Sequence, residues 1–256
     1  MKTKIHLSEN FQSPIWQEWM KKLPELIEHL PESQLIYKGR NRIYRVNHEG
    51  EWFVIKHFSN RGPWKKLVYR VSSGKARRSF LHSTALIEAG LHSPEPIGWR
   101  EDWRNGFLEE SFFVCRHVPY TYTPRAIRSQ QEIDWRPHVE NLARTIAQMH
   151  EAELLHLDLT PGNILFVKEK PDDWPIYFID NNRMSFGKIG LRKGIRSLLQ
   201  PGIEGALLEP FITAYGKTRG FDQADCQRLY NRLLISYQRK WKIKNATRPW
   251  RRKIGL

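Results

Sequence analysis

The chain has few cysteines and no long apolar segment. Its 256 residues include two cysteines, Cys115 and Cys226, which lie far apart. This spacing provides neither a disulfide framework nor the cysteine pairs of a structural zinc site, and it favours a reducing compartment. No apolar run approaches the roughly 20 residues that a helix needs to span a bilayer. The first ten residues are polar and charged and do not form the apolar core of a signal peptide.

Acidic residues are scarce relative to basic ones. The chain has 42 Lys and Arg against 27 Asp and Glu, a formal net charge of +15 with His neutral. Such an excess favours an anionic partner, whether nucleic acid, an acidic membrane surface or a phosphorylated substrate. A hydrophobic content of 40% and an aromatic content of 12% are typical of a folded chain and exclude a disordered one.

The most informative stretch is residues 156–166, which have the frame H-x-D-x-x-x-x-N followed by an apolar strand. Phosphoryl transfer requires in-line positioning of the reactants and cations against the triphosphate, with little covalent chemistry from the protein. In this frame we expect Asp158 to orient the attacking hydroxyl and Asn163 to hold magnesium. A second apolar strand, residues 177–179, ends in Asp180, which we expect to be the other magnesium ligand.

The residues around this loop agree with a kinase-like catalytic centre. A helix that begins near an N-cap at Asp134 is predicted before it, because apolar residues recur there at helical spacing: Val139, Leu142, Ala143, Ile146, Ala147 and His150. Within the loop, Pro161 and Gly162 supply a turn. His156 is expected to brace the loop by hydrogen bonds.

The region before the catalytic loop has the order of an ATP-binding lobe. After an amphipathic helix over residues 11–30, the pattern predicts strand, loop, strand, turn, strand, and the third strand carries Lys56. We expect Lys56 to bind the α- and β-phosphates of ATP; the alternative is a solvated lysine on a strand edge. The loop between the first two strands offers Gly39, Arg40 and Asn41 to the nucleotide. This loop has a single glycine and is not a G-x-G-x-x-G, so a basic surface hairpin is the alternative.

In these motifs the chain resembles the lipopolysaccharide core kinases, bacterial sugar kinases that phosphorylate Kdo or heptose on the inner core. The resemblance runs in order through residues 38–41, 54–56, 74–79, 94–97, 156–166 and 178–184. The K-A-R-R-S run and the D-x-N-R-M ending are more specific than the catalytic loop.

The resemblance implies an α+β, protein-kinase-like bilobal fold, with an antiparallel-sheet N-lobe and a mainly helical C-lobe. We expect the N-lobe to be residues 1–118, with the ATP-binding sheet, and the C-lobe to be residues 119–256, with the catalytic loop and a basic tail. The implied cofactors are ATP and magnesium. The implied acceptor is an anionic glycolipid, the lipopolysaccharide core, at the cytoplasmic face of the inner membrane, where the chain would be peripheral.

The chain departs from the protein-kinase pattern at two informative points. The helix predicted over residues 76–88 should offer a glutamate to Lys56, but the expected position falls near Leu81, and the one acid of this helix, Glu88, is close to its C-terminal end. Residues 181–182 are Asn-Asn where protein kinases have Phe-Gly, and no A-P-E follows. The second departure favours a small-molecule or lipid kinase over a protein kinase.

Two basic stretches, residues 61–78 and 239–256, contain seven and eight Lys or Arg respectively and no acid, and both carry Trp. They are either solvated surfaces or sites that bind an anionic membrane or glycolipid, since cations attract lipid headgroups and Trp prefers the headgroup boundary. No nucleic-acid-reading module is recognisable, which argues against a nucleic-acid partner.

The sequence therefore predicts an ATP-dependent kinase that phosphorylates a sugar hydroxyl of an anionic glycolipid. One alternative is another small-molecule kinase of the same fold, of the aminoglycoside or choline type, although such cationic acceptors would favour an acidic pocket. The other alternative is a pseudokinase that binds partners without catalysis. The missing helix glutamate favours it, whereas Asp158, Asn163 and Asp180 oppose it.

Overall fold

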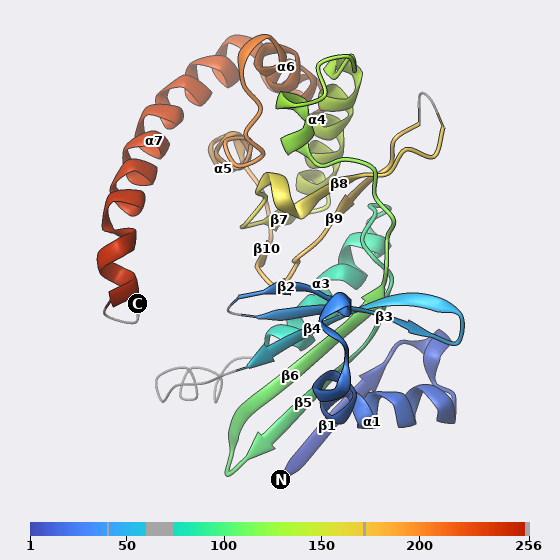
Figure 1. The fold of residues 1–256 in the computed structure, drawn as a ribbon. Coiled ribbons are helices and arrows are strands. Elements are labelled where there is room, and N and C mark those ends of the chain that lie inside the picture. Colours follow the sequence, from blue (N-terminus) through green and yellow to red (C-terminus); the bar gives the residue numbers. More distant parts are fainter. Residues whose placement is uncertain (40, 60–73, 171–172, 254–256) are drawn as a thin grey trace. The chain divides into compact units, whose positions relative to one another are not determined.

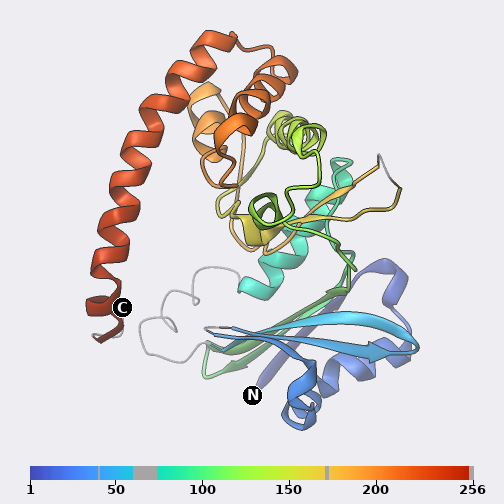
Figure 2. The ribbon, with the colours of Figure 1, turned by 45° about the horizontal axis from the view of Figure 1, so that its top comes forward.

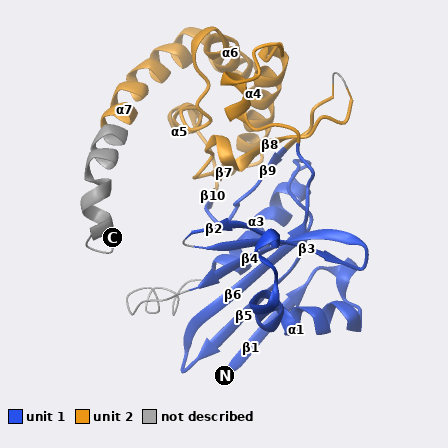
Figure 3. Ribbon diagram, in the orientation of Figure 1, with its two compact units in different colours: residues 1–120, 177–184 blue, residues 121–176, 185–256 orange. Residues whose placement is uncertain are grey.

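The computed structural model describes residues 1–39, 41–59, 74–170 and 173–253, and for residues 240–253 it describes the backbone alone. The chain divides into two compact units, residues 1–120 with 177–184 and residues 121–176 with 185–256 (Figure 3). The first division lies close to the expected lobe boundary at residue 118. Residues 177–184 also belong to the first unit, so the two units cannot be separated by one boundary in the sequence.

The first unit is built on an antiparallel sheet of six strands in the order β1-β5-β6-β4-β3-β2. The strands are β1 Lys2–Leu7, β2 Leu35–Lys38, β3 Arg42–His48, β4 Glu51–Ser59, β5 Pro96–Arg104 and β6 Phe107–Arg116. Two of the hairpins turn through residue pairs with positive φ, Glu49-Gly50 (51° and 82°) and Asn105-Gly106 (52° and 78°). Such pairs match the twist of the flanking strands, which is why an Asn-Gly sequence predicts a hairpin.

Strand β1 was not expected from the polar N-terminus. It pairs along its whole length with β5, at the edge of the sheet, and only Leu7 of its six residues is buried. A buried ion pair fixes the neighbouring strand, because Arg100 Nε lies 2.9 Å from Asp102 Oδ2. Thr3 Oγ1 donates to the same carboxylate at 2.6 Å. Apolar residues alternate in this strand only at Ile5 and Leu7, and a pattern of two positions is too short to predict a strand.

Helices α1 (Pro14–His29) and α3 (Lys75–Glu88) cover opposite faces of this sheet (Figures 1 and 2). Met20 and Leu23 of α1 belong to one buried cluster, and Ala76 and Phe80 of α3 belong to another. The expected helix over residues 11–30 therefore begins later, at Pro14. Its expected apolar residue Ile15 is 56% exposed and lies outside the core.

The second unit is mainly helical. Its helices are α4 Arg136–Glu151, α5 Leu191–Ser197, α6 Leu208–Thr218 and α7 Gln223–Lys253, with 3-10 turns at Pro124–Arg128 (η3), Pro161–Asn163 (η4) and Gly205–Leu207 (η5). Outside the large sheet, two small sheets pair β7 (Leu154–His156) with β10 (Met184–Phe186) and β8 (Ile164–Phe166) with β9 (Ile176–Phe178). Residues 177 and 178 of β9 and residue 184 of β10 belong to the first unit. The apolar residues predicted for α4 are all buried. The N-cap residue is Trp135, one position after the expected Asp134, whose Oδ1 accepts the Arg136 amide at 3.0 Å.

A buried polar contact joins three helices of this unit. His150 Nδ1 of α4 lies 2.8 Å from the Tyr215 hydroxyl of α6, and Ser197 Oγ of α5 lies 3.4 Å from His150 Nε2. Burial lowers the pKa of His150 from 6.5 to about 3, and it raises the pKa of Tyr215 to about 12. Both groups are therefore neutral near pH 7. Gly194 of α5 packs directly against the Tyr215 hydroxyl, and a side chain there would collide with it.

Helix α7 is 31 residues long. Its first turns are anchored, because Cys226, Tyr230 and Leu233 are buried, whereas its last turns have the basic sequence of residues 239–253. Among the residues that the structure describes, none of the helices combines the length and the apolar character needed to cross a membrane.

Candidate phosphoryl-transfer site

Lys56 lies in the interior of the sheet, on the face covered by α3. Strand β4 pairs with β3 and β6 on either side, so that Lys56 stands opposite Ile43 and Phe113. Alternate residues of a strand point to the same face, which places Lys56 on the side of Phe58 and the α3 cluster. The lysine is 8% exposed. A solvated lysine on a strand edge, the alternative interpretation, is therefore excluded.

The ammonium of Lys56 is paired with the predicted metal-binding carboxylate. Lys56 Nζ lies 3.5 Å from Asp180 Oδ1, and Asn182 Nδ2 donates to the same oxygen at 2.7 Å. Asp180 follows β9 with a φ of 60°, a left-handed backbone that is uncommon for residues other than glycine and that Asp adopts more readily than most. The Asp180 side chain keeps 34% of its surface exposed, so it can reach a ligand.

The Asp158 loop is braced from several directions. The Asp158 amide donates to His156 Nδ1 at 3.1 Å, which confirms the expected bracing role of His156. The next amide, that of Leu159, donates to Gln200 Oε1 at 2.8 Å. Asn163 Nδ2 donates to the Asp158 carbonyl at 2.7 Å. This bond fixes the orientation of the Asn163 amide and leaves its oxygen as the atom suited to bind a cation.

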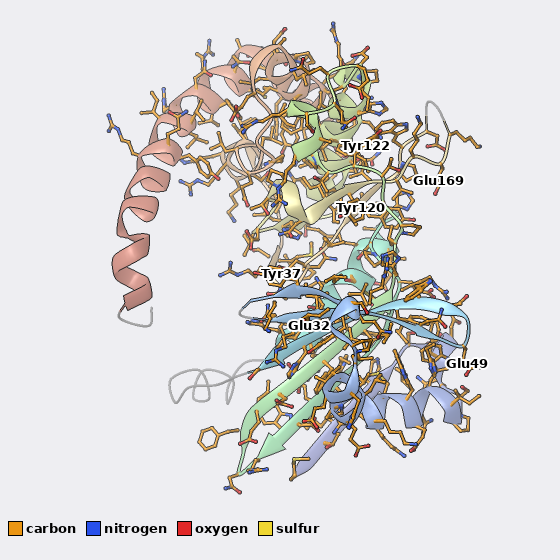
Figure 4. All side chains as sticks on the ribbon, viewed as in Figure 1. Glu32, Tyr37, Glu49, Tyr120, Tyr122 and Glu169 are labelled. Atoms are coloured by element: carbon orange, nitrogen blue, oxygen red, sulfur yellow. The ribbon has the colours of Figure 1, made fainter. Side chains whose placement is uncertain are left out.

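The predicted nucleotide loop is a short turn between β2 and β3. The Gly39 amide donates to the Asn41 carbonyl at 3.1 Å. The ring of Tyr37 lies against Gly39, and it is 54% exposed (labelled in Figure 4). Arg40 lies outside the described residues. The nucleotide-binding role of Gly39, Arg40 and Asn41 stays a prediction.

Helix α3 has no glutamate at the position that would face Lys56. Its one acid, Glu88, is the last residue of the helix, and Leu81 is 46% exposed. Among the described residues, the ion pair of Lys56 is with Asp180. The departure expected from the sequence is therefore present in the fold.

The model of the lipopolysaccharide kinase (Kdo/WaaP) family matches residues 37–193, more than half of the chain. The chain belongs to this family. Lipopolysaccharide kinases are phosphotransferases, so family membership supports phosphoryl transfer over an unrelated activity. The matched region includes every residue that the sequence pointed to, from Gly39 to Asp180.

The fold agrees with this membership. A solved structure described as "WaaP in complex with acyl carrier protein" is similar, with a TM-score of 0.62 and 22% sequence identity over 93% of this chain and 97% of that one. At this identity the likeness shows the fold, which is the expected α+β kinase-like fold with an antiparallel sheet followed by a helical part. No curated protein sequence matches the chain.

The two predicted magnesium ligands lie in different units, Asp180 in the first and Asn163 in the second. Within the described ranges no three His, Cys, Asp or Glu side chains are grouped as a self-sufficient metal site. Each of the two residues, taken by itself, is an oxygen donor of the kind that magnesium binds. Their role as magnesium ligands stays a prediction.

Several residues that shape the site were missed by the sequence analysis. Asn182 contacts Asp180, Gln200 holds the catalytic loop, and the guanidinium of Arg125 packs against Gly162. Of these, only Asn182 had a sequence signal, because it lies in the family-like run after Asp180. Gln200 and Arg125 are far from the loop in the sequence and belong to no recognisable motif.

Proposed function

We propose that this lipopolysaccharide kinase transfers the γ-phosphoryl group of ATP to a sugar hydroxyl of the inner core, on Kdo or heptose. The observation that carries the proposal is the pair formed by Lys56 and Asp180. A buried lysine beside a partly exposed carboxylate on the α3 face is the arrangement that a nucleotide phosphate and its cation require. Family membership supports the same activity.

In this proposal the first unit binds the nucleotide. Lys56 exchanges its contact with Asp180 for the α- and β-phosphates, and Gly39, Arg40 and Asn41 lie over the phosphates. Asp180 and Asn163 hold magnesium, which when bound neutralises charge on the β- and γ-phosphates.

The second unit supplies the group that acts on the acceptor. Asp158 accepts the proton of the sugar hydroxyl as the hydroxyl oxygen attacks the γ-phosphorus, and the bond from that phosphorus to the β–γ bridging oxygen breaks to release ADP. The bonds from the Asp158 amide to His156 and from Asn163 to the Asp158 carbonyl hold the backbone of this residue in place. A fixed backbone restricts the carboxylate to orientations close to the productive one.

We also propose that the basic part of α7 docks the enzyme on an anionic surface, namely the inner membrane and its glycolipid. Residues 239–253 contain eight Lys or Arg and no acid. A helix of such composition repels itself in isolation and gains stability beside anionic headgroups. The remaining basic stretch, residues 61–78, lies mostly outside the described residues, and its role in acceptor binding is part of the same proposal.

The related WaaP structure contains an acyl carrier protein. We propose this protein as a candidate partner here as well, supported by the shared fold alone. Co-elution of the two purified proteins in gel filtration would support it, and separate elution at micromolar concentrations would oppose it.

The proposed activity is tested by transfer of labelled γ-phosphate to purified inner-core glycolipid, with Asp158→Ala and Asp180→Ala as inactive variants. Incorporation that both variants abolish supports the kinase. The second candidate function, a pseudokinase, is favoured by the absence of an α3 glutamate beside Lys56. Nucleotide binding without transfer to any acceptor would select it.

A further inference from the structure

Asn181, the residue after Asp180, forms hydrogen bonds with α3, with the segment after α3 and with strand β9. Asn181 is 3% exposed. Its side-chain Nδ2 lies 3.0 Å from Ser83 Oγ, 3.0 Å from Ser93 Oγ and 3.2 Å from the Phe178 carbonyl. An amide nitrogen has two hydrogens, so two of these three oxygens accept at a time. The amide thus links α3, the segment after it and strand β9 within the first unit.

The main chain of Asn181 is held by His82, the residue before Ser83 in α3. His82 Nδ1 lies 2.6 Å from the Asn181 carbonyl oxygen. A carbonyl can only accept, so His82 carries a proton on Nδ1. Burial lowers the pKa of His82, although the bond to Asn181 opposes that shift. Two adjacent residues of one helix, His82 and Ser83, therefore bind both the backbone and the side chain of Asn181.

We propose that His82, Ser83, Ser93 and Asn181 form a clasp that positions the Asp180 carboxylate for its cation. The inference rests on the proposed function, and it assigns to α3 a task other than pairing with Lys56. In this enzyme α3 acts on the metal-binding carboxylate through the adjacent residue. None of the four touches the reacting atoms, so they are positioning residues.

Backbone geometry supports this assignment. Asp180 has a φ of 60°, an uncommon left-handed conformation that hydrogen bonds of the two following residues help to hold. Asn182 donates to the carboxylate oxygen of Asp180. The clasp holds the side chain of Asn181 and the carbonyl of the peptide that joins Asn181 to Asn182. The expected α3 glutamate would fall near Leu81, next to His82. Helix α3 therefore contacts the segment after Asp180 from nearly the same position along the helix, through hydrogen bonds in place of an ion pair.

The test compares magnesium-dependent nucleotide binding in variants of the full chain. Binding of a non-hydrolysable ATP analogue is measured by calorimetry with and without Mg²⁺. We expect Asn181→Ala to reduce the gain in affinity due to Mg²⁺ by about tenfold or more, which is the usual effect of removing a group that orients a metal ligand. Affinity without Mg²⁺ should change little, because Lys56 is unchanged.

The chain offers a matched control on the same helix. Ser79 of α3 is 1% exposed, and its hydroxyl has no hydrogen-bond partner among the described residues. Ser79→Ala should leave the Mg²⁺ effect unchanged, whereas the double variant Ser83→Ala/Ser93→Ala should reduce it. His82→Asn, whose amide can replace the Nδ1 donor, should keep more of the effect than His82→Ala.

The outcomes separate the two proposals. If the native chain shows no Mg²⁺-dependent binding of the analogue, the proposed function fails. If the native chain shows it and a folded Asn181→Ala keeps it in full, the clasp is overturned. If Asn181→Ala does not fold, the His82 and serine variants provide the test. The clasp is overturned if all of these variants show the same gain in affinity due to Mg²⁺ as Ser79→Ala.

Discussion

The Lys56 ammonium and the Asp180 carboxylate form an ion pair of 3.5 Å on the α3 face of the sheet. Each group is the counter-ion of the other, and in the proposed function Lys56 binds the nucleotide phosphates and Asp180 binds the cation.

Replacing Lys56 should weaken nucleotide binding. We expect Lys56→Met to lower the affinity for an ATP analogue by about tenfold or more, since a buried charge that contacts phosphate is lost. Calorimetry measures the effect. Lys22→Met, which removes an exposed lysine of α1 from the same unit, is the control and should bind as the native chain does.

Replacing Asp158 should separate binding from transfer. Asp158→Asn keeps the backbone carbonyl that accepts from Asn163, so the loop should keep its structure. We expect kcat for the glycolipid acceptor to fall by about a hundredfold to ten-thousandfold, the range for loss of a general base. Affinity for the nucleotide should change little. Transfer at the native rate by Asp158→Asn would show that the hydroxyl is oriented by another group.

Acid should destabilise the second unit through His150. Its pKa is lowered from 6.5 to about 3 in the folded chain, so the unfolded chain binds more protons between these values and stability falls as the pH drops through this window. The slope contributed by this one group is at most about 1.4 kcal/mol per pH unit. Urea unfolding at pH 7 and pH 5 measures it.

The matched variant for that measurement is His150→Gln, which cannot titrate. Other groups also respond to acid, so the informative quantity is the difference between the two proteins. The native chain should lose more stability than His150→Gln from pH 7 to pH 5. Equal losses would mean that His150 is protonated equally in the folded and unfolded chains.

The contact of Gly194 with Tyr215 gives a stability prediction with an internal control. Gly194→Ala places a Cβ against the Tyr215 hydroxyl, and we expect it to lower the free energy of unfolding by about 1–3 kcal/mol, as overpacking does. Gly190→Ala adds the same methyl group four residues earlier, where nothing lies within 4 Å. Gly194→Ala should therefore melt at a lower temperature than Gly190→Ala. Similar melting temperatures for the two variants would contradict the close contact between Gly194 and Tyr215.

The basic part of α7 should govern membrane binding. Changing Lys240, Lys242 and Lys244 to Gln should weaken sedimentation with anionic vesicles by about a hundredfold, at about 1 kcal/mol for each cation near the surface. Changing Lys2, Lys21 and Lys22 to Gln alters the net charge equally and is the control. Equal losses of vesicle binding in the two variants would show that the overall charge of the protein, and not this helix, governs membrane binding. No preference of the native chain for anionic over neutral vesicles would remove the membrane proposal.

Local patterns predicted much of the fold. Helical spacing placed α4, and the catalytic frame led to a loop that His156 braces. These features depend on neighbours in the sequence. The contacts that were missed join residues far apart, such as Thr3 with Asp102 and His82 with Asn181, each 99 positions apart. A single sequence carries no record of such pairings when the residues are polar and belong to no motif.

The return of residues 177–184 to the first unit has a consequence for how the chain is made. A nascent chain that ends at residue 120 already holds all six strands of the large sheet. It lacks Asn181, however, so Ser83 and Ser93 would meet water instead of an amide. The sheet unit can reach its final form only after synthesis has passed residue 184, which makes its maturation depend on translation of much of the helical unit.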